Sequence, residues 1–112
     1  MTTLSDDAAP DALNTYLEIT RAWGLTATEA STLLGIEGGI SNRKLNPDQT
    51  ERIRHTLDIN RLLHALLPES ADAWISKPNN ASLFGGRTAL ELLQSGTDGF
   101  RQVRNYLGST AS

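Results

Sequence analysis

The 112-residue sequence contains no cysteine. This absence excludes disulfide bonds, thiolate nucleophiles and cysteine-based zinc sites. No apolar run approaches the ~20 residues that a membrane-spanning helix requires, so we expect no membrane segment. The first nine residues are polar and acidic and lack the apolar segment of a secretory signal. Together these absences predict a cytoplasmic protein.

Basic residues are also few: ten Lys and Arg stand against 13 Asp and Glu, which gives a net charge of −3. Residues 1–20 include four acidic residues and no Lys or Arg. The rest of the chain is close to neutral. Strong nucleic-acid binders usually show a basic stripe, because neutralising phosphates supplies most of their affinity. That stripe is thin here.

Groups suited to catalysis or metal binding are scarce as well. No serine, histidine and acid form a recognisable nucleophile motif, and the acidic residues are scattered over polar helix faces. His55 and His64 are nine residues apart on one predicted helix, which places them on opposite sides, so they cannot hold one metal ion. We expect surface or interface histidines, no metal, no cofactor and no enzyme activity.

What the sequence does contain is a series of helix signals. After a polar segment at 1–10, which we expect to be disordered, apolar residues recur every three or four positions from Asp11 until Gly24, with Trp23 as a core anchor. Thr26 and Glu29 have capping-box spacing before a short helix that Gly35 ends. Asn46 and Pro47 start a helix to about Leu67, whose broad apolar face should pack on both halves of the protein.

The chain beyond Pro68 alternates breakers with apolar residues. We expect a short helix with a buried Trp74, a turn at 78–80, and an apolar plug at Leu83 and Phe84 that either docks inward or is covered by a partner. Thr88 should cap a helix to Leu93. Thr97 should cap a last helix that Gly108 closes, leaving 109–112 as a polar tail.

The segment from Thr26 to Ile36 reads like the first helix of a helix-turn-helix unit. The following stretch, 37–45, begins with Glu-Gly-Gly and leaves little more than one turn for a recognition helix. Its candidate DNA contacts are Asn42, Arg43 and Lys44. A solvated polar loop that closes the helical core is an equally good interpretation of this stretch.

The motifs from Trp74 to Leu107 resemble a known family. These motifs are similar to the toxin-binding segment of the Xre/MbcA/ParS antitoxins. They are Pro-Asn at 78–79, Leu-Phe-Gly-Gly-Arg at 83–87, Ala-Leu at 89–90 and Val-Arg-x-Tyr-Leu at 103–107. The resemblance implies an all-α protein with a Xre-like helix-turn-helix half, here shortened and degenerate, and a helical toxin-binding half. We place the first at 11–67 and the second at 68–112.

The resemblance also implies a function. Members of this family neutralise RES-domain toxins, which consume NAD or transfer parts of it, by occluding the toxin's active site; they commonly form homodimers within the toxin complex and often repress their own operon. The shortened segment at 37–45 argues against operator binding here. A helix-turn-helix repressor without a toxin partner is the alternative. The candidate toxin-binding residues are Asn79, Leu83, Gly85, Gly86, Arg87, Arg101, Arg104 and Tyr106. For Arg104, a toxin contact competes with an intramolecular salt bridge to Asp98 or Glu91.

Overall fold

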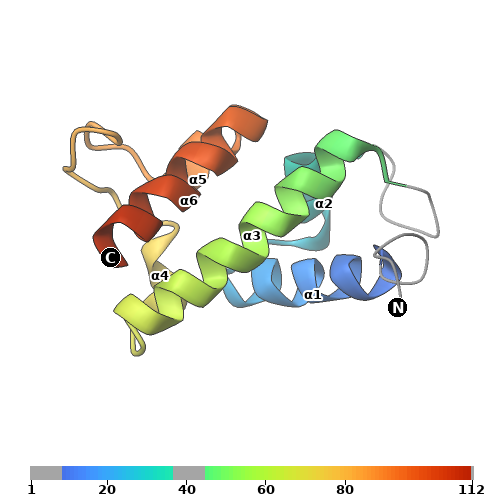
Figure 1. Ribbon diagram of the computed structural model, residues 1–112, viewed down its shortest axis with the longest axis horizontal. Coiled ribbons are helices and arrows are strands. Elements are labelled where there is room, and N and C mark those ends of the chain that lie inside the picture. The colour runs from blue at the N-terminus through green and yellow to red at the C-terminus, as the bar shows by residue number, and fades with distance from the viewer. Residues whose placement is uncertain (1–8, 37–44, 112) are drawn as a thin grey trace.

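The computed structural model describes residues 9–36 and 45–111, and within these ranges the chain is all-α (Figure 1). The helices of the described ranges are α1 (Ala9–Ala22), α2 (Ala27–Leu34), α3 (Pro47–Leu66), α4 (Ala71–Trp74), α5 (Ala89–Leu93) and α6 (Thr97–Ala111). Strand-like pairing is limited, in these ranges, to one isolated antiparallel bridge between Pro78 and Thr88. The predicted fold class is therefore confirmed.

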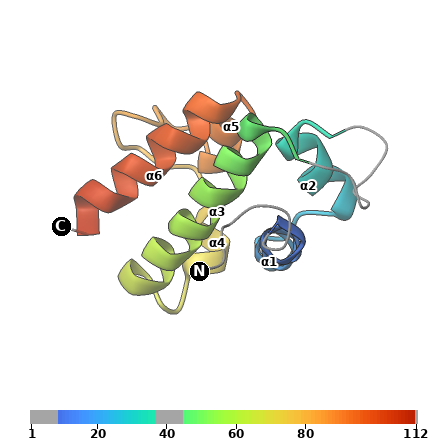
Figure 2. The ribbon, with the colours of Figure 1, turned by 45° about the vertical axis from the view of Figure 1, so that its right-hand side comes forward.

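Helix α3 runs through the middle of the molecule, with α1 and α2 on one side and α5 and α6 on the other (Figures 1 and 2). It contacts α1, α2, α4 and α6. Ile53, near its start, belongs to a core cluster shared with α1 and α2, whereas Ile59 and Leu63 belong to a larger cluster that includes α4, α5 and α6. The apolar face of α3 therefore packs on both halves of the protein, as its width predicted.

Three helices start at the cap residues that the sequence predicts, and each start is a full capping box. The side chains of Thr26, Asn46 and Thr88 each accept a hydrogen bond from the backbone N–H three residues later. The side chain at that third position accepts one in return from the cap's own N–H. Each cap is worth about 1 kcal/mol, because it satisfies backbone donors that the helix itself leaves unpaired. The sequences of these three caps therefore locate the starts of α2, α3 and α5.

The two tryptophans differ in burial. Trp23 is 4% exposed and lies in the larger core cluster, as expected. Trp74 was expected to be buried too, but it is only partly buried and packs against the edge of that cluster. Trp74 is the last residue of the single-turn helix α4, and its ring contacts the rings of Phe84 and Tyr106.

Helix α6 departs from its predicted boundaries at both ends. Thr97 is its first residue and not its cap, because the Thr97 hydroxyl is bonded to side chains of α3. Gly108 does not close the helix, which continues to Ala111 through the positions expected to be a tail. A glycine costs a helix only about 1 kcal/mol, and buried Val103 and Leu107 hold the preceding turns in place. The helix therefore continues past Gly108 to Ala111.

Candidate functional site

The segment 76–88 between α4 and α5, hereafter the 76–88 loop, is closed at its base by backbone hydrogen bonds. The N–H of Asn79 donates to the carbonyl of Arg87 at 3.0 Å, and the N–H of Gly86 donates to the carbonyl of Asn79 at 2.8 Å. The bridge between Pro78 and Thr88 lies next to these bonds. Pro78 and Thr88 are thus held together, although nine residues lie between them in the chain.

The tip of the loop is held by a second set of bonds. The side-chain oxygen of Asn79 accepts from the N–H of Ala81 at 2.8 Å, and the carbonyl of Ala81 accepts from Phe84 and Gly85 at 2.9 and 3.0 Å. Gly85 and Gly86 have φ values of 58° and 90°, which side chains disfavour. The sequence Asn-x-Ala with a later Gly-Gly therefore specifies the shape of this loop.

Phe84 anchors the loop to the helices. Its side chain is fully buried, and its ring meets the rings of Trp74 and Tyr106 edge-on, with centroids 5.6 and 5.2 Å apart. The rings of Trp74 and Tyr106 lie nearly parallel, with centroids 6.4 Å apart. Leu83 is partly buried against the same cluster. Phe84 therefore docks inward, which is one of the two arrangements predicted for Leu83 and Phe84.

The exposed edge of the loop carries positive charge. Arg87 and Lys77 are both exposed, and neither forms an ion pair with a carboxylate in the described part of the chain. The Arg87 Nε donates to the carbonyl of Phe84 at 3.2 Å, which fixes the direction of the guanidinium. The structure thus brings Asn79, Leu83, Gly85, Gly86, Arg87 and Tyr106 together, five on the loop and one beneath it.

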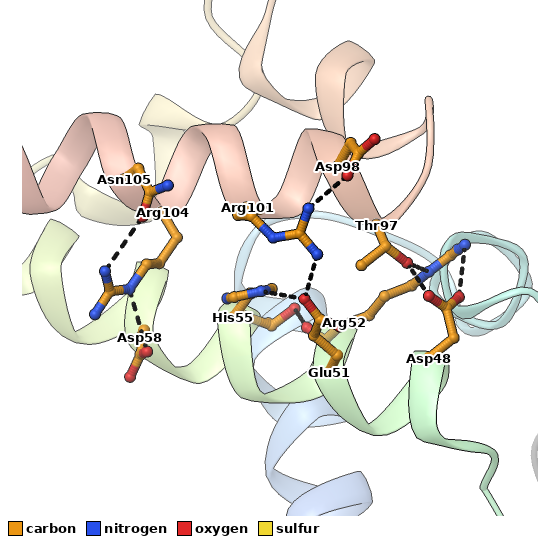
Figure 3. A network of polar contacts seen from close by, with 11 residues as sticks. Asp48, Glu51, Arg52, His55, Asp58, Thr97, Asp98, Arg101, Arg104 and Asn105 are labelled. Atoms are coloured by element: carbon orange, nitrogen blue, oxygen red, sulfur yellow. Dashed lines mark hydrogen bonds and ion pairs between the residues drawn. The ribbon is translucent and has the colours of Figure 1, made fainter.

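Arg101 lies on the other side of α6, facing α3 (Figure 3). Its guanidinium bonds Glu51 at 2.7 Å and Asp98 at 2.6 Å. Glu51 also bonds the His55 Nε2 at 3.1 Å. The hydrogen bonds from Arg101, and then His55, hold the pKa of the Glu51 carboxyl below its ordinary value, and the same carboxylate raises the pKa of Arg101.

Arg104 lies one turn further along α6 and pairs with Asp58 of α3, at 3.4 Å from Nε to Oδ2 (Figure 3). Arg104 therefore forms an intramolecular salt bridge, which was one of the two interpretations of this residue. Its partner, however, is neither of the two predicted acids, Asp98 and Glu91. Asp98 binds Arg101, and Glu91 belongs to the cap of α5. Arg101 and Arg104 of α6 thus both pair with carboxylates of α3.

Sequence reasoning missed Arg52, which joins three helices. Its Nη1 donates to the carbonyl of Leu33 at the end of α2, and its Nε donates to the Thr97 hydroxyl at the start of α6, both at 2.9 Å. Its Nη2 pairs with Asp48 at 3.1 Å, and its guanidinium lies 5.9 Å from the ring centre of Phe100. The sequence gives no local signal for the link between helices, because Leu33 and Thr97 are distant from Arg52 in the chain.

The histidines have separate partners. His55 is largely buried between α3 and α6, with its side chain 14% exposed, whereas His64 is exposed and lies 3.6 Å from Asp72. No cluster of three or more His, Cys, Asp or Glu side chains suited to a metal ion occurs among the described residues. The predicted DNA contacts Asn42, Arg43 and Lys44 lie outside the described residues, so operator recognition stays a prediction.

The fold and this surface define an all-α protein whose C-terminal part presents a preformed, cationic loop on an aromatic support. Residues 62–112 match the family of the antitoxin Xre/MbcA/ParS C-terminal toxin-binding domain, which confirms the resemblance stated above for this segment. The match begins within the last turns of α3 and includes the whole 76–88 loop and α6. Neither curated proteins nor solved structures gave a match. Among the described helices, none is both long and apolar enough to cross a bilayer.

Proposed function

We propose that this protein is an antitoxin that binds a RES-domain toxin and neutralises it by covering the toxin's active site. The observation that carries the proposal is the family match over 62–112, which coincides with the ordered loop and its aromatic support. Because NAD is the substrate of such toxins, it belongs to the partner, and the antitoxin itself needs no cofactor and catalyses nothing. The proposal places the protein in the cytoplasm, where NAD is available to the toxin.

The 76–88 loop and Tyr106 are the toxin-binding surface that this proposal favours. A binding surface gains affinity when its shape already exists before association, because less conformational entropy is then lost. The backbone bonds within the loop and the fully buried Phe84 provide such a preformed shape. Arg101 and Arg104 are already engaged with α3, so in our proposal they support the surface and do not form its contacts.

The decisive experiment is co-expression with the RES-domain toxin encoded beside this chain. We expect the chain to restore growth, to co-purify with the toxin as a stable complex, and to suppress NAD loss in an assay with the purified toxin. A homodimer within that complex is expected from the resemblance, and the mass of the complex in solution tests it. Normal NAD loss in the presence of excess antitoxin would contradict the proposal.

Repression of its own operon is a separate part of the proposal. It is supported by α2, whose capping box and length suit the first helix of a helix-turn-helix unit. We expect a salt-dependent shift of operator DNA that is lost on Arg43→Ala with Lys44→Ala. No binding at low salt would restrict the protein to toxin neutralisation, whereas operator binding without any toxin complex would favour the alternative of a repressor alone.

A further inference from the structure

Charge on the 76–88 loop has one sign. Lys77 and Arg87 are its charged residues, and no acid accompanies them between positions 76 and 88. Over residues 68–112, by contrast, four basic and four acidic residues balance. The loop is therefore a small cationic surface within a neutral C-terminal part.

The arginines of α3 and α6, apart from Arg54, already have carboxylate partners among the described residues. Arg101 pairs with Glu51 and Asp98, while Arg61 and Arg104 share Asp58. Within the described residues, Lys77 and Arg87 have no such partner. A cation without a partner can gain a full charge-assisted interaction on association, whereas a paired one must first give up an existing interaction.

The geometry of Arg87 suits a carboxylate. Its Nε is occupied by the carbonyl of Phe84, which leaves both Nη groups without a hydrogen bond among the described residues. Two parallel N–H donors on one planar edge match the two oxygens of a carboxylate. Beside Arg87, a Cβ added to Gly85 or Gly86 would meet nothing within 4 Å, so the backbone there is open to close approach by another molecule.

We infer that Lys77 and Arg87 form a docking contact for carboxylate side chains on the partner protein, located beside the partner's active-site cleft and not inside it. The inference rests on the proposed function. A cleft that binds a dinucleotide with two negative charges is expected to be basic or polar, and it would repel a loop with two positive charges. Nucleic acid is a poorer fit, because two cations neutralise too few phosphates for useful affinity on a chain with a net charge of −3.

The test is the affinity of the purified chain for the co-encoded RES-domain toxin, measured at low and high salt. Lys77→Glu with Arg87→Glu should weaken binding by about tenfold or more at low salt and should reduce the salt dependence, because two attractions become repulsions. Arg87→Lys alone should bind more weakly than the wild type but more tightly than the double glutamate variant, since a lysine keeps the charge but cannot bind a carboxylate bidentately.

Arg21→Glu with Arg54→Glu is the matched control. Both arginines are exposed, lie outside the loop and form no ion pair within the described residues, so the control makes the same change in net charge. Thermal unfolding should be similar for all variants, because the four side chains are at the surface. Equal weakening by loop variant and control would overturn the inference, since only the overall field would then matter.

The remaining outcomes separate the inference from the proposed function. If the loop variant binds the toxin as tightly as the wild type, the inference is wrong and the proposed function stands. If the wild type forms no complex with the toxin, the proposed function fails first. Binding of duplex DNA that depends on Lys77 and Arg87 would overturn the choice of carboxylates as the ligand.

Discussion

Gly99, in the first turn of α6, occupies a position where no side chain fits. A Cβ added there would lie 1.8 Å from the carbonyl oxygen of Leu92 and 2.8 Å from the Ser95 hydroxyl. Leu92 belongs to α5, so the glycine allows α5 and α6 to approach each other closely. The obstacle is mainly backbone, which a rotamer change cannot move. Gly99→Ala must therefore shift α6 relative to α5.

Two effects of opposite sign act on Gly99→Ala, and their magnitudes decide the outcome. Alanine is favoured over glycine inside a helix by about 1 kcal/mol. Overpacking in a well-packed region costs about 1–3 kcal/mol and more when backbone has to move. Because the contact of 1.8 Å is to a carbonyl oxygen, we expect the upper end of that cost and a net loss of about 2 kcal/mol.

Gly108→Ala is the control on the same helix. A Cβ at Gly108 would meet only the Arg104 Nη1, at 3.9 Å, which is ordinary contact. Helix propensity favours alanine at this position, and we expect a gain of up to about 1 kcal/mol. The same substitution should therefore have opposite effects at two positions nine residues apart.

Urea unfolding followed by far-ultraviolet circular dichroism measures both variants. With a slope of about 2 kcal/mol per molar urea, the midpoint should fall by about 1 M for Gly99→Ala and rise by about 0.5 M for Gly108→Ala. A Gly99→Ala protein as stable as the wild type would refute the close approach of α5 and α6. A loss at both positions would instead mean that α6 tolerates no alanine for reasons unrelated to Leu92.

Three further predictions concern the core and the contacts of α3. Phe84→Ala should lower the free energy of unfolding by about 4 kcal/mol, because a fully buried ring and its two edge-on contacts are lost; a loss below about 1 kcal/mol in urea unfolding would show that the ring does not anchor the loop. Tyr16→Phe should cost about 1 kcal/mol, since the buried Tyr16 hydroxyl donates to the carbonyl of Ala30 at 2.7 Å, and an unchanged midpoint would contradict that bond. The pKa of Glu51 is lower in the folded protein than its ordinary value of about 4.5. Its carboxylate therefore stabilises the fold fully above the ordinary pKa, and this stabilisation is lost as the pH falls through the pKa of the folded state. Glu51→Gln should therefore be less stable than the wild type near neutral pH, and this difference should narrow as the pH falls below the ordinary pKa of a glutamate. A difference that does not change with pH would contradict the pairing with Arg101.

The starts of three helices could be predicted because the capping box is local. Thr26, Asn46 and Thr88 each act on a residue three positions away, so four residues of sequence contain the whole interaction. Thr97 has the same residue type but a different role, since its hydroxyl bonds Arg52, 45 positions earlier. The capping box itself distinguishes the two cases, because Phe100, and not Glu or Gln, stands three positions after Thr97. The threonine alone therefore misplaced the helix start by one residue.

The candidate surface was predictable in part for a similar reason. The motif from 83 to 87 combines apolar residues with two glycines, which predicts a loop whose Leu83 and Phe84 either dock inward or are covered by a partner. The sequence does not reveal that Tyr106 supports the loop, nor that Arg104 faces Asp58, 46 positions earlier on α3. Both follow from how α6 is oriented, which depends on the packing of the whole core.

The orientation of α6 also decides which of its arginines can add to binding energy. For Arg101 to bind a partner, it would have to release Glu51 and Asp98, and Arg104 would have to release Asp58. A partner that offered one carboxylate would only replace an existing one and would leave an acid of α3 without its cation, so the net gain would be small. Arg87 gives up no carboxylate, and its guanidinium is already directed by the carbonyl of Phe84. In the proposed complex, Arg87 should therefore add more to the binding energy than Arg101 or Arg104, whose ion pairs connect α6 to α3.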